Sequence, residues 1–243
     1  MRYGIISDIH ANLEALEAVL TSLKEVDAFI CLGDIVGYGP NPNECVEAVR
    51  ALPGVKCVVG NHDLACVGSY DINWFNWYAR DAIVWTQERL TAASRSHLLS
   101  LPLMEMQNSL TLVHGALPQP MDYVTSEKEA RGVFAEMITP VCLIGHTHVA
   151  EYYAHAHGAA HLEHRSWAHG GEIRFSRGVS YLVNCGSVGQ PRDGNPHASF
   201  GIYDTTRREL RVRRVAYQVE QVRERIAAAG LPALLGDRLL VGR

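Results

Sequence analysis

Short apolar runs recur through the first two thirds of the chain, and each leads directly to a polar residue. The run at 29–32 leads through Gly33 to Asp34, and four apolar residues in a row are typical of a strand covered on both faces. Four other runs end at carboxylate, amide or imidazole side chains: Asp8 with His10, Asn61, His114, and His146 with His148. Because ligands of open α/β sheets bind beyond the carboxyl ends of the strands, these runs indicate one candidate site.

The first sixty residues alternate between strand and helix patterns with short connections. The expected elements are, in order, a strand at 2–7, a helix at 12–24, a strand at 28–32, a helix at 43–51 and a strand at 55–59. Such β-α-β units form parallel strands with right-handed crossovers. Asp8, Asp34 and Asn61 should therefore emerge from the same edge of one sheet, although they lie far apart in the sequence.

The remainder of the chain is expected to complete a single domain over residues 1–243. Residues 63–100 have a helical, aromatic-rich pattern and are interpreted as a cap-like insertion, and the strands at about 149–215 are expected to form a second sheet against the first. The expected elements are strands at 103–107 and 110–114, a helix at 126–137, a strand from 141, strands at 149–155, 160–165, 171–175, 180–184, 199–204 and 209–215, and helices at 218–229 and 232–240.

Three conspicuous segments are assigned to structure rather than to chemistry. The aromatic residues at 70–85 recur at helical spacing, which favours packing over a cap that stacks on a nucleobase. The histidines at 155–169 have no partner carboxylate at ligand spacing, so a solvated hairpin is favoured over a metal site. The arginines at 207–214 are interpreted as a charged strand edge that opposes aggregation rather than as a nucleic-acid surface.

Composition and charge narrow the class of partners. The 243 residues carry a formal net charge of -4, which gives no general attraction to nucleic acid or to anionic membranes. No apolar run is long enough to span a bilayer, and the chain enters a strand directly after Met1, so we expect no signal peptide and a cytoplasmic location. Three of the six cysteines, Cys31, Cys57 and Cys142, fall inside expected strands and are interpreted as small core residues.

The residues at the strand ends are types that bind borderline transition metals. Seven of them offer oxygen or imidazole atoms, enough for two metal ions if one carboxylate bridges: Asp8, His10, Asp34, Asn61, His114, His146 and His148. Asp34, from the middle strand in chain order, is the expected bridge. Two divalent cations and two carboxylates leave a charge of about +2, which attracts phosphate and lowers the pKa of a bridging water so that hydroxide forms near neutral pH.

Two residues beside the ligands have chemistry suited to catalysis. His62 follows Asn61 directly and is expected to point elsewhere, where it can protonate a leaving oxygen or stabilise charge in the transition state. Asp63 is expected to orient His62, although capping of the following helix would also explain an aspartate there.

The ordered motifs resemble the calcineurin-like metallophosphoesterase superfamily. They are Asp8-Ile9-His10, Gly33-Asp34, Gly60-Asn61-His62-Asp63, His114-Gly115 and Gly145-His146-Thr147-His148. The resemblance implies an α/β fold, a four-layer α/β/β/α sandwich with two mixed sheets flanked by helices. It also implies Asp8, His10, Asp34 and His148 on one metal, Asp34, Asn61, His114 and His146 on the other, and His62 as the catalytic histidine.

Within this superfamily the chain is similar to short bacterial phosphoesterases and to diadenosine polyphosphate hydrolases. The loop Gly37-Tyr38-Gly39 stands where protein phosphatases carry an arginine that grips phosphate, so protein phosphatase activity is not expected. Arg192, on a turn after a strand, is the candidate replacement for phosphate binding, and a surface turn arginine is the alternative. Asn12 either binds phosphate at a helix N-terminus or only caps that helix.

Three functions therefore compete. The favoured one is a dimetal phosphohydrolase acting on a small phosphodiester, phosphomonoester or dinucleoside polyphosphate. A nuclease on the same fold would need a basic groove that follows the phosphate backbone. A non-catalytic interaction module would not need the complete ligand set. Mn²⁺, Fe²⁺, Zn²⁺, Co²⁺ and Ni²⁺ all suit these ligands. The expected partner is a small phosphorylated substrate such as a nucleotide, and neither a membrane nor a nucleic acid.

Overall fold

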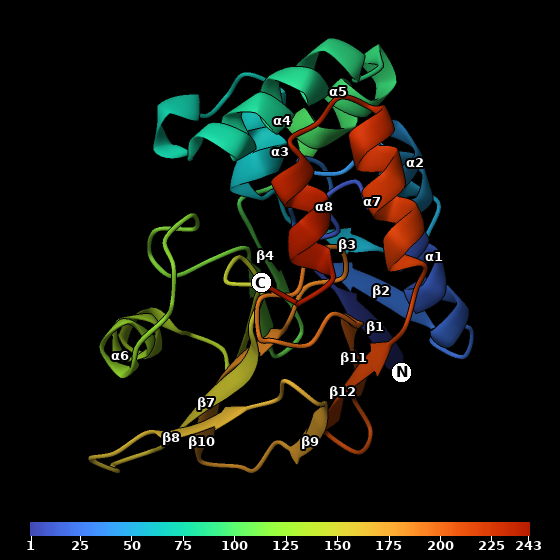
Figure 1. Cartoon of the computed structure of the whole chain (residues 1–243). Helices are drawn as coiled ribbons and strands as arrows, with labels where there is room; N and C mark the ends of the chain where they lie inside the picture. Colours follow the sequence, from blue (N-terminus) through green and yellow to red (C-terminus); the bar gives the residue numbers. More distant parts are fainter.

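The computed structural model describes all residues, 1–243, as two stacked sheets with helices around them (Figure 1). The strands are β1 Arg2–Ile6, β2 Ala28–Cys31, β3 Lys56–Cys57, β4 Met104–Gln107, β5 Leu110–Val113, β6 Val141–Ile144, β7 Ala150–Ala156, β8 Glu163–Ser166, β9 Gly171–Arg174, β10 Val179–Cys185, β11 Ala198–Asp204 and β12 Glu209–Val215. The helices are α1 Leu13–Ser22, α2 Pro42–Arg50, α3 Asn61–Cys66, the 3₁₀ turn η1 Ile72–Trp74, α4 Trp77–Arg89, α5 Ala92–Ser100, α6 Glu127–Glu136, α7 Val219–Ala228 and α8 Ala233–Leu239.

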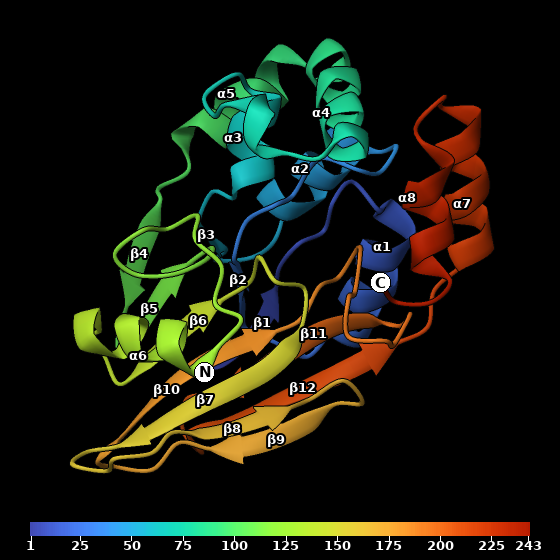
Figure 2. The same ribbon diagram turned by 60° about the vertical axis from the view of Figure 1, so that its left-hand side comes forward.

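Each sheet contains six strands and mixes parallel with antiparallel pairs. The first sheet has the order β3-β2-β1-β11-β12-β9, and the second has the order β4-β5-β6-β10-β7-β8. Strands β1, β2 and β3 are parallel, as are β5, β6 and β10. The parallel strands of both sheets end near the same part of the molecule, which is where the candidate ligands follow them in the sequence (Figure 2).

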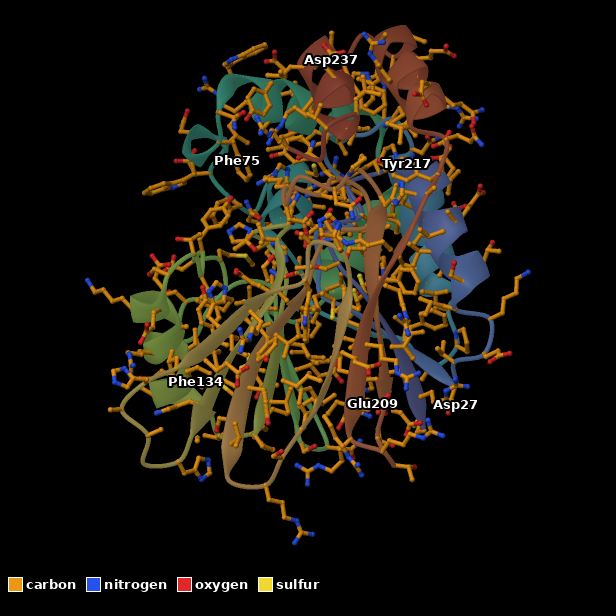
Figure 3. The ribbon with its side chains drawn as sticks, turned by 60° about the horizontal axis from the view of Figure 1, so that its bottom comes forward. Asp27, Phe75, Phe134, Glu209, Tyr217 and Asp237 are labelled. Atoms are coloured by element: carbon orange, nitrogen blue, oxygen red, sulfur yellow. The ribbon has the colours of Figure 1, made fainter.

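Successive side chains along each strand point to opposite faces of its sheet, and this alternation produces three apolar layers. Ile5 and Leu143 belong to the layer between the two sheets, whereas Ile6 and Ile144 point outward to the helices. Helices α1 and α2 pack on the outer face of the first sheet, and α6 packs on the outer face of the second. Phe134 on α6 and Tyr217 near α7 lie on opposite sides of the stacked sheets (Figure 3). The expected four-layer α/β/β/α sandwich with two mixed sheets is confirmed.

The assignment of all strands at 149–215 to the second sheet is wrong. Only β7, β8 and β10 lie there, whereas β11, β12 and β9 extend the first sheet. The reason is the antiparallel pairing of β11 with β1, in which Tyr3 faces Tyr203 across 200 positions of sequence. Period-two alternation predicts a strand, but it carries no information about which distant strand will be its neighbour.

The segment after β3 is helical, and the C-terminal helices pack against it. Ala79 and Ala82 of α4 share an apolar cluster with Leu235 of α8 and with Tyr38 from the loop after β2. Trp85 of α4 donates a hydrogen bond from its indole nitrogen to the carbonyl of Ala229, 2.9 Å away. No helix in the structure combines the length and the apolar character needed to cross a membrane.

Candidate metal centre

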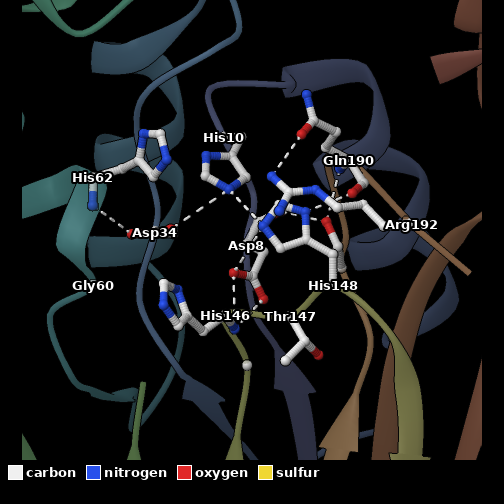
Figure 4. A network of polar contacts seen from close by, with 12 residues as sticks. Asp8, His10, Asp34, Gly60, His62, His146, Thr147, His148, Gln190 and Arg192 are labelled. Atoms are coloured by element: carbon white, nitrogen blue, oxygen red, sulfur yellow. Dashed lines mark hydrogen bonds and ion pairs between the residues drawn. The ribbon is translucent and has the colours of Figure 1, made fainter. Parts of the chain in front are cut away.

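The strand ends of the two sheets bring two groups of ligand atoms together (Figure 4). In each group the ligand atoms lie within 4.8 Å of one another, and the groups are Asp8, His10, Asp34 and His148, and Asp34, His114 and His146. Asp34 belongs to both groups, and all six residues are buried. Each group joins the first sheet to the second, because His114, His146 and His148 follow β5 and β6 whereas the aspartates follow β1 and β2.

Hydrogen bonds to the backbone fix how three of the histidines present their rings. The Nδ1 atoms of His10, His114 and His148 lie 3.2, 2.7 and 2.6 Å from the carbonyl oxygens of Val36, Leu32 and Gln190, respectively. Because a carbonyl only accepts, each Nδ1 carries the proton and each Nε2 offers its lone pair to the centre. This is the arrangement in which metal-binding histidines are usually held.

Lone pairs face one another at the centre without protein donors between them. Nε2 of His10 lies 3.1 Å from Nε2 of His148, and the Nδ1 protons on both rings leave a lone pair on each Nε2. Buried polar atoms normally have partners, but Oδ2 of Asp34, Oδ1 of Asn61 and Nε2 of His146 have none. Such a cluster requires positive charge between the lone pairs, and transition-metal cations supply it with the ligand types that they prefer. The residues present therefore fit divalent metal ions.

The local backbone at the ligands is unusual. Five of the ligand residues have left-handed φ angles, which a non-glycine residue adopts only at a cost of about 1 kcal/mol or more: Asp8, His10, Asp34, His146 and His148. The left-handed conformation turns the chain sharply at the end of each strand and directs consecutive ligands inward. Gly60 permits the close approach of the next loop, because a Cβ atom there would lie 2.1 Å from Oδ1 of Asp34.

Electrostatics within the cluster favour a charged Asp34. Burial opposes the carboxylate, but the neighbouring His114 and His62 outweigh burial and hold the pKa of Asp34 well below its usual value. Burial alone would lower the pKa of His114. The negative charge of Asp34 outweighs burial and raises this pKa to about 10. Burial raises the pKa of Asp8 to about 6. Metal binding would displace the proton that the His114 and Asp34 pair otherwise shares.

His62 lies beside the ligands but its ring is not among them. Its backbone N–H donates to Oδ1 of Asp34 at 2.9 Å, while its ring packs between Tyr38 and Phe75 with centroid distances of 4.4 and 4.7 Å. The buried Nδ1 atom has no hydrogen-bond partner. Burial lowers the pKa of His62 to about 4, which favours a neutral ring with one N–H to donate. The ring also lies edge-on to the ring of His10, with a centroid distance of 4.8 Å.

Asp63 holds the backbone rather than His62. Its two carboxylate oxygens accept hydrogen bonds from the backbone N–H groups of Val36 and Gly60, at 3.0 and 3.1 Å. Burial raises its pKa to about 7. No hydrogen bond joins Asp63 to the ring of His62, so its contacts match the capping alternative: Asp63 caps α3 and ties the loop after β2 to the loop after β3.

Asn12 is also a capping residue. Its side-chain oxygen accepts from the N–H of Ala15, and its side-chain nitrogen donates to the carbonyl of Gly189 at 2.9 Å. The side chain is buried, and both polar atoms are occupied. The expectation that Asn12 binds substrate therefore has no support in its contacts, because capping alone accounts for them.

Arg192 does reach the centre. Its Nη2 atom donates to the hydroxyl of Tyr38 at 3.3 Å and to Oε1 of Gln190 at 3.0 Å, and its buried Nε atom has no partner. Arg192 lines the same cavity as His62 and His146 (Figure 4). Sequence reasoning missed the neighbouring Tyr123, whose ring stacks on His146 at a centroid distance of 3.7 Å. No motif marks Tyr123, since it comes from an irregular loop.

Comparison with known proteins agrees with the fold. The model of the calcineurin-like phosphoesterase superfamily domain matches residues 1–208. An uncharacterized protein of Methanocaldococcus jannaschii is 37% identical over 253 residues, covering 99% of this chain and 98% of that protein. A symmetrical bis(5'-nucleosyl)-tetraphosphatase of Erwinia tasmaniensis is 29% identical over 141 residues, covering 54% of this chain and 50% of that enzyme.

Among solved structures, a metallophosphoesterase from Sphaerobacter thermophilus has a TM-score of 0.91 and 41% sequence identity, and covers 100% of this chain and 99% of its own. The sandwich with its buried cluster of aspartates and histidines at the strand ends defines a metal-dependent phosphoesterase. The chain belongs to the calcineurin-like phosphoesterase superfamily, as its motifs indicated.

Proposed function

We propose that the chain is a dimetal phosphohydrolase that acts on a small phosphodiester, phosphomonoester or dinucleoside polyphosphate. The observation that carries the proposal is the position of Asp34, which belongs to both groups of ligand atoms. One ion would be held by Asp8, His10, Asp34 and His148, and the other by Asp34, Asn61, His114 and His146. When bound, the ions supply Lewis-acid stabilisation of the phosphoryl oxygens and activate water for attack.

The chain's own residues then position and stabilise the phosphoryl group. His62 donates a hydrogen bond to a phosphoryl or leaving-group oxygen, supported by its place in the lining of the cavity beside His146. Arg192 makes a charge-assisted contact to a further oxygen, supported by its place in the lining of the same cavity. Asp63 keeps the two loops in register through their backbone amides and is a positioning residue.

A small substrate agrees with the surroundings of the centre. Beyond the metal cluster lies a cavity of about 400 Å³, within the range of small-molecule sites. Its wall contains aromatic residues and only two arginines, so it lacks the long basic groove that a nuclease requires. The relative from Erwinia tasmaniensis bears the name of a nucleotide hydrolase, which supports a small phosphorylated substrate here. The complete ligand set argues against a non-catalytic module.

Metal analysis combined with two substitutions tests the proposal. Wild-type protein loaded with Mn²⁺ should contain two ions per chain and hydrolyse bis(p-nitrophenyl) phosphate. Asp34→Asn should lose the shared ligand, with fewer than two ions bound and nearly all turnover lost. His62→Ala should retain both ions while kcat falls by on the order of 100-fold.

The exposed Asp81→Asn serves as the control and should match wild type in metal content and turnover. Full turnover of Asp34→Asn would rule out the shared site. Loss of metal from His62→Ala would show that the division between ligands and His62 is wrong.

A further inference from the structure

The cavity beside the metal centre is lined by aromatic and arginine side chains that hydrolysis of a simple phosphate ester does not require. Asn61, His62 and His146 form its floor, next to the ligand atoms. Above them the wall consists of residues from the helical segment, from the loop at 121–123 and from α8, together with Tyr38 and Arg192. The cavity therefore extends from the reacting centre into a region where a second part of a substrate can bind.

The aromatic residues on this wall divide into packed and exposed ones. Phe75 packs against the ring of His62 and lies where the helical segment meets the strand ends (Figure 3). Trp74, one position earlier on η1, lines the cavity and leaves 80% of its surface exposed. Trp85 in the same segment is half-buried and hydrogen-bonded. Packing thus explains Trp85 and Phe75 but leaves Trp74 free at the cavity.

The loop at 121–123 contributes a second aromatic side chain to the cavity wall. Tyr123 stacks on His146 and is 50% exposed, so its outer face is open to a ligand. Tyr70 also lines the cavity and is half-buried. Flat aromatic ligands stack on such side chains irrespective of their hydrogen-bonding pattern, because every base has a π face.

Two arginines without carboxylate partners lie on the same wall. Arg192 contacts Tyr38 and Gln190. Arg238 of α8 donates from Nε to the carbonyl oxygen of Arg243 at 2.7 Å and from Nη1 to the hydroxyl of Tyr78 at 3.1 Å, which leaves Nη2 without a protein partner. Neither guanidinium forms an ion pair, whereas many other arginines of the chain do. A single phosphate held at the metals leaves Arg238 without an anion, and guanidinium groups bind phosphate strongly.

We propose that this cavity binds a nucleoside polyphosphate, with its base on Trp74 and its outer phosphates beside Arg192 and Arg238. The inference deepens the proposed function and rests on it, since it assigns a substrate class to the same centre. Within the aromatic segment, Trp74 would contact the ligand, whereas other aromatic side chains serve packing. Trp74 contributes stacking area for the base, and Arg238 selects ligands with more than one phosphate.

Equilibrium binding separates the two contributions. The ligand is the α,β-methylene analogue of ADP, which resists hydrolysis at its bridge, and methylenediphosphonate is its base-free counterpart. Calorimetry on the Mn²⁺-loaded protein should show Trp74→Ala weakening the nucleotide analogue about tenfold, with no change for methylenediphosphonate. Arg238→Gln should weaken both ligands, by about tenfold.

Two surface variants control for general effects of the substitutions. Trp77→Ala removes a tryptophan that is 57% exposed but does not line this cavity, and Arg89→Ala removes an arginine elsewhere on α4. Both should bind like wild type. Equal weakening by Trp74→Ala and Trp77→Ala, or no weakening by Trp74→Ala, would overturn the base site.

The outcome also distinguishes this inference from the proposed function. A protein that hydrolyses bis(p-nitrophenyl) phosphate but binds the nucleotide analogue no better than methylenediphosphonate retains the proposed function and loses the inference. A protein that binds the analogue through Trp74 but hydrolyses no phosphoester with any of the five candidate metals retains the binding site and loses the proposed function.

Discussion

At the scale of single residues, chemical type predicts the centre better than it predicts local roles. The candidate ligands were identifiable because each is a metal-binding type at the end of an apolar run. The contacts of Asp63 and Asn12 were not, because an aspartate or asparagine at a helix start serves equally well as a cap or as a functional group. Only the hydrogen bonds to Val36, Gly60, Ala15 and Gly189 distinguish the two.

Gly37 provides a test of how closely His62 must be positioned. Its φ is +87°, and a Cβ atom there would lie 2.7 Å from Nδ1 of His62. Gly37→Ala should therefore displace the imidazole and lower kcat by about 10- to 100-fold while metal content stays at the wild-type value. Steady-state kinetics and metal analysis measure the two quantities.

A matched variant separates the effect of the contact with His62 from the effect of placing alanine at a positive φ angle. Gly68 has a φ of +82°, but no atom lies within 4 Å of a Cβ placed there. Gly68→Ala should lose a similar stability, about 1 kcal/mol, and keep wild-type kcat. An equal fall in kcat for both variants would show that backbone strain, not the position of His62, limits turnover.

At the scale of elements, the periodicity of the sequence predicts the positions of most helices and strands but not which strands pair with one another. The helix expected at 43–51 is α2, Pro42–Arg50, and the strand expected at 149–155 is β7, Ala150–Ala156. The strand expected at 55–59 shrinks to two residues in β3, because the chain turns there into the start of α3 at Asn61. The placement of β11 beside β1 depends on pairing between the two ends of the chain, which no local pattern encodes.

The C-terminal helices should stabilise the loop beside the centre through packing. Leu235 of α8 is fully buried in the cluster that also contains Tyr38 and Ala82. Leu235→Ala should lower the free energy of unfolding by about 2 to 5 kcal/mol, because it removes buried methyl groups and leaves a cavity. Urea titration followed by circular dichroism measures the change.

The adjacent leucine is the control for this substitution. Leu234 is 42% exposed, so Leu234→Ala should change the free energy of unfolding by about 0.5 kcal/mol or less. Similar losses for the two variants would contradict the role of the α8 face in packing.

At the scale of the whole molecule, each ligand group connects the two sheets. Asp8, His10 and Asp34 come from the first sheet, whereas His148 comes from the second. The family and the sandwich could be inferred from the motifs, because the ordered set resembles that of the calcineurin-like superfamily. The exposed Trp74 and the unpaired Arg238 could not, since their importance arises only from the shared cavity.

Metal binding should therefore raise the stability of the entire sandwich. Ions that bind only the folded chain at about 1,000 times their Kd contribute about 4 kcal/mol, which corresponds to a rise of roughly 10 °C in Tm. Differential scanning calorimetry with Mn²⁺ and with chelator measures this shift. Asp34→Asn should show little or none of it, and identical Tm values for wild type in the two conditions would contradict the proposed coupling.

The ligands and the wall of the cavity belong to separate stretches of the chain. The candidate metal-binding atoms lie at the strand ends and at the start of α3, whereas Tyr70, Trp74 and Tyr78 lie on the helical segment that follows α3. Replacing the segment after α3 with another of different shape would leave the candidate ligands in place. Substrate preference can therefore change through this segment while metal-dependent hydrolysis at the strand ends is retained.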